Sequence, residues 1–265
     1  MRISLTRPLL PLLLLSIFWP VLAFGQSAPP APPSGEPEAN LATPCEEHGL
    51  STVFKCIWTD VRHLARPGSL MWLGAGGGLA AGSLLFDDAV EESFRADHQD
   101  YAVAVGENLG EAGLHFGVPA ALYVVARTTR HPEAAALAIT LVRAQVVNAV
   151  MTRSLKLIPR SRPYQDDARA GHGSFPSGHA SATFASATVL ARRWGWRAGL
   201  PAFAVATFVG ATRLQNVHYL SDVTFGAALG IASGLTIDMP GKRTTVSPMV
   251  GPGVAGVTIA VAGQP

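Results

Sequence analysis

Six apolar stretches of helix length occupy most of the chain between residues 69 and 237. Short polar or basic segments separate them, which is the pattern of consecutive packed helices. We expect helices over residues 69–86, 112–127, 134–153, 179–193, 199–213 and 220–237. The chain is therefore predicted to be all-α, with a six-helix bundle as its main domain at residues 69–240.

The composition narrows the class of protein further. Hydrophobic residues make up 48% of the 265 residues and charged residues 14%, against roughly 25% charged residues in ordinary soluble domains. Such a chain is not intrinsically disordered, and its net charge of +2 excludes a nucleic-acid-binding polycation. Residues 151–265 hold 11 basic and 4 acidic side chains, so we expect any anion site in the second half.

Both ends of the chain have their own patterns. Residues 1–25 place Arg2 and Arg7 before an apolar stretch, as in a secretory signal peptide, and an uncleaved membrane anchor is the alternative. The Pro-rich residues 26–44 read as a linker. In the tail at residues 241–265, β-branched residues alternate with Gly and Pro between Thr244 and Val261, which predicts a short β-hairpin.

The only cysteines, Cys45 and Cys56, lie in an N-terminal segment at residues 45–68 and are separated by ten residues. In an exported protein this spacing suits one local disulfide. Two unpaired thiols are the alternative.

The sequence leaves open whether the helices span a membrane or form a soluble periplasmic bundle. Arginines gather at alternate breaks, which the positive-inside rule would place on the cytoplasmic side. If a signal peptide exports residue 26, however, six later spans would have the opposite orientation, and these arginines would lie outside the cytoplasm. Both alternatives place the protein in the inner membrane or the periplasm, with the polar motifs below facing the periplasm. Gly74 with Gly78, and Gly226 with Gly230 and Gly234, have the spacing of closely packed helices.

Three polar clusters in the basic half lie at predicted helix boundaries. They comprise Lys156, Arg160, Arg162 and Pro163; then Phe175, Pro176, Ser177, Gly178 and His179; then Arg213, His218 and Asp222. Ammonium, guanidinium, hydroxyl and helix N-terminal amide groups that converge on one point would bind phosphate. The phosphate ligands we expect are Lys156, Arg162, Ser177, Gly178 and Arg213.

Two histidines in such a pocket can divide the work of phosphoryl transfer. Asp222 follows His218 by four residues, so both lie on one face and the carboxylate can fix the tautomer of a nucleophilic imidazole. His179, at the start of a helix, suits the general acid. We expect no cofactor and no metal ligand in this site.

These motifs resemble those of the type 2 phosphatidic acid phosphatase superfamily, which includes the vanadium-dependent haloperoxidases. The likeness covers about residues 70–237 and is most specific at Ser-Phe-Pro-Ser-Gly-His-Ala-Ser. It implies a six-helix bundle in which His218 forms a phosphohistidine, Asp222 orients it and His179 is the acid. The first and third motifs are each one residue shorter than usual, which weakens the assignment of Lys156 and Arg213.

The interpretation is an exported, metal-independent phosphatase that cleaves phosphomonoesters or diphosphates on a phosphorylated lipid or a small ester. A vanadium haloperoxidase and an inactive envelope protein with a vestigial phosphate site are the alternatives. Arg160 is assigned either to phosphate or to the surface. The acidic stretch from Asp87 to Glu111 is interpreted as a solvated face. Arg169 and His172 are interpreted as solvated loop residues, with substrate contact as the alternative.

Overall fold

The computed structural model describes residues 50–95, 101–163, 173–215, 217–239, 242–251 and 254–263. Their helices are α3 (Leu50–His63), α4 (Pro67–Ser83), the 3-10 helix η2 (Leu84–Phe86), α5 (Asp87–Phe94), α6 (Tyr101–Gly110), α7 (Ala112–Thr128), α8 (Pro132–Leu155), α9 (Gly178–Trp194), α10 (Trp196–Thr212) and α11 (Leu220–Thr236). The predicted signal peptide, the linker and Cys45 lie outside the described residues, as do Arg169 and His172.

All six predicted helices are present within a few residues of their expected bounds. The first corresponds to α4 with η2, and the others to α7, α8, α9, α10 and α11. Pro67 and Pro132 stand in the first turn of α4 and α8, where proline needs no hydrogen-bonded amide and its fixed φ suits the helix. The all-α prediction is confirmed for residues 50–239 of the described chain.

Three further helices were not predicted. α3 lies in the segment that holds Cys56, where polar and apolar residues alternate too closely for a continuous apolar run. α5 and α6 lie in the acidic stretch before Glu111, which was interpreted as a solvated face. That interpretation was wrong for Asp87, because only 4% of its surface is exposed.

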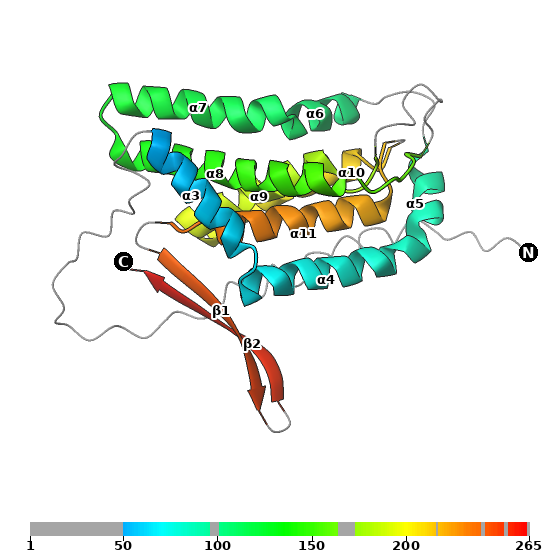
Figure 1. Cartoon of the computed structure of the whole chain (residues 1–265). Coiled ribbons are helices and arrows are strands. Elements are labelled where there is room, and N and C mark those ends of the chain that lie inside the picture. The colour runs from blue at the N-terminus through cyan, green and yellow to red at the C-terminus, as the bar shows by residue number, and fades with distance from the viewer. Residues whose placement is uncertain are drawn as a thin grey trace, which may run out of the picture. The chain divides into compact units, whose positions relative to one another are not determined.

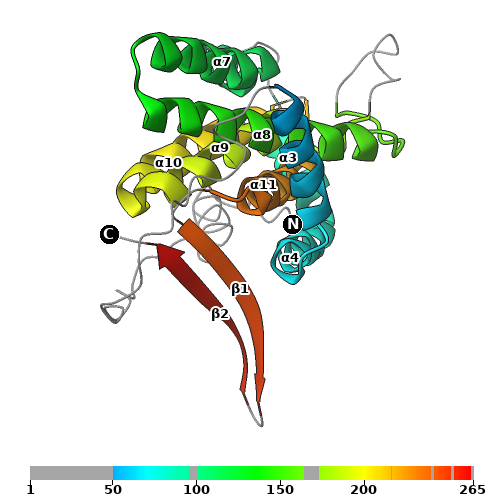
Figure 2. The same cartoon turned by 60° about the vertical axis from the view of Figure 1, so that its left-hand side comes forward.

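Helices α8, α9 and α11 pack on one another, with α7 against α8, α10 against α9 and α4 against α11. Figures 1 and 2 show this arrangement from two sides. The end of α8 and the start of α11 lie at the same end of the bundle, next to α5 (Figure 1). All three sequence motifs are carried by chain segments at this end.

Glycines on α11 let it lie directly against α9. A Cβ atom on Gly226 would stand 2.6 Å from the carbonyl oxygen of Ser177, and one on Gly234 would stand 2.7 Å from Cβ of Thr188. The close packing predicted for this helix is confirmed. It was wrong for Gly74 and Gly78, which face open space; Gly76 is the α4 residue that packs against α11, at Ala228.

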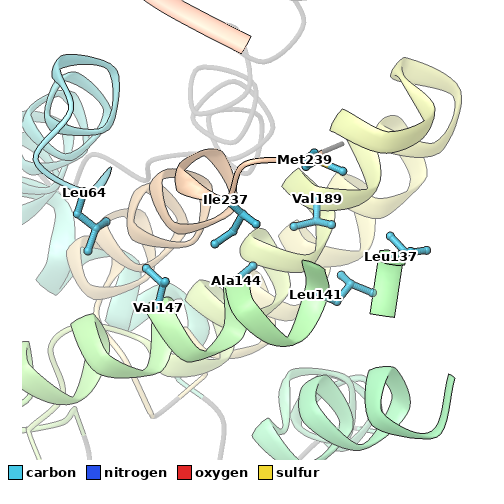
Figure 3. Packing of buried hydrophobic residues seen from close by; sticks show 8 residues of the cluster. All are labelled: Leu64, Leu137, Leu141, Ala144, Val147, Val189, Ile237 and Met239. Carbon is cyan, nitrogen blue, oxygen red and sulfur yellow. The ribbon is translucent and has the colours of Figure 1, made fainter. Parts of the chain in front are cut away.

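A cluster of buried apolar side chains joins α8 to α9. It also includes residues from the segments that directly follow α3 and α11. Figure 3 shows its members, which are Leu64, Leu137, Leu141, Ala144, Val147, Val189, Ile237 and Met239. Next to it, the guanidinium of Arg143 on α8 donates two hydrogen bonds to the buried carboxylate of Asp60 on α3, at 2.8 and 2.7 Å. Cys56, one turn before Asp60, is disulfide-bonded. Its predicted partner Cys45 is not described, so the pairing stays a prediction.

The bundle contains helices suited to a membrane. Residues Pro67–Phe94 and Pro132–Leu155 are each long and apolar enough to cross one, and α6 with α7, bent by 52°, would make a third span. Large apolar side chains are exposed along three outer helices: Leu70 and Leu79 on α4, Val118, Val124 and Val125 on α7, and Leu200, Val205 and Phe208 on α10. Exposed apolar surface of this extent favours the membrane alternative over a soluble bundle.

The described C-terminal residues form two strands. β1 (Lys242–Gly251) pairs antiparallel with β2 (Val254–Gly263), in a register that sets Thr244 opposite Val261.

Candidate active site

Backbone hydrogen bonds join the three motif segments at one end of the bundle. The amide of Ser177, at the start of α9, donates to the carbonyl of Asp222 on α11 at 3.0 Å, and the amide of Ser174 donates to the carbonyl of Arg160 at 2.8 Å. Each motif is therefore held by backbone contacts with another. The side chains that the sequence placed in one site come from segments that are tied together.

His218 and Asp222 form the buried centre of this region. Nδ1 of His218 lies 3.7 Å from Oδ2 of Asp222, and both side chains are almost fully buried. Ser174 lies between them: its hydroxyl donates to Oδ2 of Asp222 at 2.6 Å and lies 3.2 Å from Nδ1 of His218. The Tyr219 amide also donates to Oδ2 of Asp222, at 3.0 Å. Since these groups occupy the Nδ1 side of the ring, Nε2 is the nitrogen left to react.

Burial lowers the pKa of His218 to about 4, although Asp222 acts in the opposite direction. The imidazole is therefore neutral above that pH. A neutral imidazole has the free electron pair that a nucleophile needs.

Arg160 contacts two buried carboxylates. Its Nη1 forms an ion pair with Oδ1 of Asp222 at 3.0 Å, and its Nη2 donates to Oδ2 of Asp87 at 2.7 Å. The guanidinium also lies over the ring of Tyr219, 4.7 Å from the ring centroid. From the sequence, Arg160 was expected to be either a phosphate ligand or a surface charge. The structure shows it instead between two buried carboxylates.

His179 is the first residue after Gly178 on α9, and its side chain faces α6. Its Nε2 is buried without a hydrogen-bond partner, and the nearest carboxylate oxygen, on Glu111, lies 3.9 Å away. A Cβ atom on Gly110 would come within 2.5 Å of the His179 ring, so glycine there lets α6 cover the imidazole. Burial lowers the pKa of His179, with Arg213 acting in the same direction and Glu111 against it.

The charges of Lys156 and Arg162 act on His218, and those of Arg162 and Arg213 act on His179. The ammonium of Lys156 donates to the carbonyls of Gly173 and Pro176, at 3.1 and 3.0 Å. Burial, aided by the charge of Arg162, lowers the pKa of Lys156 to about 8. The same Arg162 charge also lowers the pKa of His179 and of His218, which places this guanidinium within electrostatic reach of both rings.

Arg213 and Ser177 present polar atoms that have no hydrogen-bond partner. One Nη of Arg213 donates to the carbonyl of Val103 at 3.0 Å, while its Nε is buried and unpaired. Ser177 is fully buried, and its hydroxyl has no partner either. Buried polar atoms of this kind are rare without a ligand or water to pair them. These atoms and the first amides of α9, after Gly178, are donors of the kind that an anion can pair.

Sequence reasoning missed three residues that shape the site: Ser174, Asp87 and Gly110. Ser174 stands in the same short motif as Ser177, so its position was a usable signal. Asp87 and Gly110 act through contacts with distant parts of the chain. Among the described residues, no group of three or more His, Cys, Asp or Glu side chains could hold a metal ion.

Comparison with known proteins identifies the domain. The PAP2 superfamily profile matches residues 133–243, which include all eight candidate residues but not Asp87. The chain is 42% identical over 65 residues to a lipid A 1-phosphatase of Porphyromonas gingivalis, an alignment that covers 23% of this chain and 15% of that protein. It is 41% identical over 68 residues to a decaprenylphosphoryl-5-phosphoribose phosphatase of Mycobacterium tuberculosis, covering 26% and 37% of the two chains. The chain thus spans well under half the length of either relative.

Among solved structures, a transmembrane PAP2 type phosphatidylglycerolphosphate phosphatase from Bacillus subtilis matches 71% of this chain and 92% of its own, at 14% identity and a TM-score of 0.40. The motifs at the end of the helical bundle lie within the segment matched by the family profile. The segment at residues 133–243, which holds all three motifs, belongs to the PAP2 superfamily.

Proposed function

We propose that the protein is a phosphatase that hydrolyses lipid-linked phosphomonoesters or diphosphates through a phosphohistidine, without a metal ion. The observation that carries the proposal is the buried contact of His218 with Asp222 and Ser174, in a region where Lys156, Arg162 and Arg213 supply positive charge. This combination suits attack of a neutral imidazole on a bound phosphoryl group.

In the first step, Nε2 of His218 attacks phosphorus and forms the N–P bond while the bond to the leaving oxygen breaks. His179 acts in its protonated form, which its lowered pKa makes more populated at acidic pH. It gives its proton to the leaving oxygen, so the alcohol or phosphate leaves in neutralised form. Asp222 and Ser174 hold the Nδ1 side of the ring and stabilise the positive charge that develops there. Lys156, Arg162, Arg213, Ser177 and the Gly178 amide stabilise the charge on the phosphoryl oxygens.

In the second step, water attacks the phosphohistidine. His179, now neutral, takes a proton from the water, and the N–P bond breaks to release inorganic phosphate and free His218. Each histidine returns to its starting protonation state. His179 therefore acts as an acid and then as a base, as a two-step transfer requires.

Two observations support a lipid-linked substrate. The exposed apolar faces of α4, α7 and α10 are suited to contact with a bilayer, where such a substrate is dissolved. The names of the two relatives refer to phosphates carried on lipid A and on a decaprenyl chain.

The distribution of arginines supports a periplasmic active site. Arg127 lies in the last turn of α7 and Arg130 follows that helix, while Arg192, Arg193 and Arg197 surround the α9–α10 junction. Connectivity therefore puts these arginines at the end of the bundle opposite the motifs. The positive-inside rule assigns that end to the cytoplasm. On this rule the motif end faces the periplasm, in a protein held in the inner membrane.

The test is phosphate release by the purified protein from phosphatidic acid, phosphatidylglycerol phosphate, undecaprenyl diphosphate and a soluble aryl phosphate. His218→Ala should lower the rate about 10³-fold or more, roughly 4 kcal/mol of activation free energy. His131→Ala, at the exposed start of α8, is the matched control and should change little. Equal rates for wild type and His218→Ala would contradict the proposal, as would peroxide-dependent bromination that requires added vanadate.

A further inference from the structure

We propose that Asp87 and Arg160 form a positioning unit that holds Asp222, and through it His218, in the reactive orientation. The inference rests on the proposed function, since it assigns a role to residues behind the proposed nucleophile. Neither residue contacts the His218 ring in the contacts described above. Asp87 lies on α5, outside the segment that matches the family profile.

The carboxylate of Asp222 is held on both of its oxygens. Oδ2 accepts from Ser174 and from the Tyr219 amide on the side of His218, and Oδ1 faces Nη1 of Arg160. Oδ1 accepts no hydrogen bond, so the ion pair with Arg160 is its contact. The attraction of Arg160 for Oδ1 adds to the hydrogen bonds on Oδ2 and favours the orientation in which Oδ2 faces the imidazole.

Asp87 fixes Arg160 in turn. Its Oδ2 accepts from Nη2 of Arg160 at 2.7 Å, and the guanidinium plane is supported by the ring of Tyr219. The Arg160 side chain is 23% exposed, whereas those of Asp87 and Asp222 are 6% and 0% exposed. With one Nη on each carboxylate, the guanidinium is oriented by protein groups and its charge is already paired. Because its charge is paired in this way, we do not count Arg160 among the cations that bind phosphate.

Asp87 also holds the helix that carries Asp222. Its Oδ1 accepts from the backbone amide of Ser221 at 2.9 Å, and its Oδ2 accepts from the Ser221 hydroxyl at 2.6 Å. A carboxylate at the start of α11 is favourable for the helix dipole as well. Asp87 therefore constrains Asp222 twice, through the Arg160 side chain and through the adjacent backbone. Figure 1 shows α5 beside the start of α11.

A positioning unit predicts a specific kinetic pattern. Loss of Arg160 or Asp87 loosens Asp222, so the imidazole is less often aligned for attack and kcat falls. Phosphate binding depends on other cations, so KM and the inhibition constant of inorganic phosphate stay nearly constant. A phosphate ligand would show the opposite pattern, with weaker binding of both substrate and phosphate.

The variants are Asp87→Asn, Arg160→Met and Arg160→Lys, with Arg193→Met as the control because Arg193 contacts Glu133 at the opposite end of the bundle. We expect kcat to fall about 10- to 100-fold in Arg160→Met, as for other groups that orient a reactive residue, and somewhat less in Asp87→Asn. Arg160→Lys should recover part of the loss because it keeps the charge. The phosphate inhibition constant should stay within about twofold throughout, which also shows that the variants are folded.

A double variant separates positioning from general damage. On an Asp222→Asn background, Arg160→Met should cost little more, because the carboxylate it positions is already gone. An additive loss would overturn the inference, and so would a phosphate inhibition constant that rises in step with the loss of kcat/KM. Wild-type kcat in both Asp87→Asn and Arg160→Met would overturn it while leaving the proposed function intact.

If the wild type releases no phosphate, the proposed function fails. The positioning of His218 by Asp87 and Arg160 can then still be tested by the ¹⁵N resonances of the His218 ring. Arg160→Met and Asp87→Asn should then both shift the Nδ1 resonance, and Arg193→Met should not. Unshifted resonances in the first two variants would overturn it.

Discussion

Two buried arginine–aspartate systems stand at different places in this bundle. Asp60 and Arg143 form a closed pair in which both carboxylate oxygens meet one guanidinium, with side chains 1% and 3% exposed. At the motif end, Arg160 instead lies between two carboxylates, those of Asp87 and Asp222. The first system joins α3 to α8, and the second joins α5 to the chain that carries His218.

The difference lies in what else the carboxylate holds. Asp60 makes its strong hydrogen bonds with Arg143 alone. Removal of the Asp60 carboxylate would therefore leave the buried charge of Arg143 without a close negative partner. Asp222 also binds Ser174 and the Tyr219 amide, and Arg160 keeps Asp87 as a partner if Asp222 is changed. The same two residue types thus serve stability in one place and orientation of an imidazole in the other.

The largest expected effect is that of Asp222→Asn on activity. The amide would remove the negative charge beside Nδ1 of His218, and we expect kcat to fall about 10³-fold, near 4 kcal/mol. The free energy of unfolding should change by less than about 1 kcal/mol, because Arg160 remains paired with Asp87. Steady-state kinetics and denaturant unfolding in the same detergent check both. A variant that unfolds readily but keeps its kcat would reverse the comparison.

Asp60→Asn should show the complementary result. Removal of one partner of a closed buried pair is expected to lower the free energy of unfolding by about 3 kcal/mol, while kcat per folded molecule stays at the wild-type value. Denaturant unfolding and active-site titration measure the two quantities. A loss of kcat without a loss of stability would mean that the two systems are not separate in function.

Ser174→Ala tests the hydroxyl between His218 and Asp222. Without it, the 3.7 Å gap between Nδ1 and Oδ2 is not bridged, and we expect kcat to fall about tenfold, equal to roughly 1.4 kcal/mol. Ser233→Ala is the control, since Ser233 is equally buried and bonds the Leu229 carbonyl within α11. Equal kinetics in the two variants would remove Ser174 from the site.

The smallest expected effect is a pH dependence from Lys156. Its pKa is lowered to about 8, so its positive charge is present below that pH and is lost above it. We expect kcat/KM to fall about fourfold between pH 7 and 8.5 as the charge is lost. In Lys156→Arg the guanidinium stays charged, so the fall should disappear. The same fall in both proteins would assign it to another group.

Apolar periodicity was sufficient to predict the helices that form the bundle. The six long helices have continuous apolar runs, whereas α5 and α6 are short and include acidic residues, so no comparable run marks them. The close approach of α11 to α9 was also predicted from Gly226, Gly230 and Gly234. The packing role of Gly76 was not predicted, because α4 contains several neighbouring glycines and the sequence does not show which of them faces another helix.

The site residues that stand close together in a sequence motif could be predicted. His218 and Asp222 are four residues apart, and Ser177 to His179 are consecutive, so local geometry brings them together. Asp87 is 73 residues from Arg160 and 134 from Ser221, and no periodicity links positions so distant. Arg162 was assigned to phosphate, but the role of Arg160 stayed open in the sequence because it depends on the distant carboxylate of Asp87.

The stereochemical course at phosphorus tests the central claim, a two-step transfer through His218, most directly. An aryl phosphate made chiral with oxygen isotopes, with an alcohol as acceptor, gives a product whose configuration can be read by ³¹P NMR. Two successive in-line displacements, onto His218 and then onto the acceptor, predict retention of configuration. Inversion would mean a single direct displacement and would contradict the account.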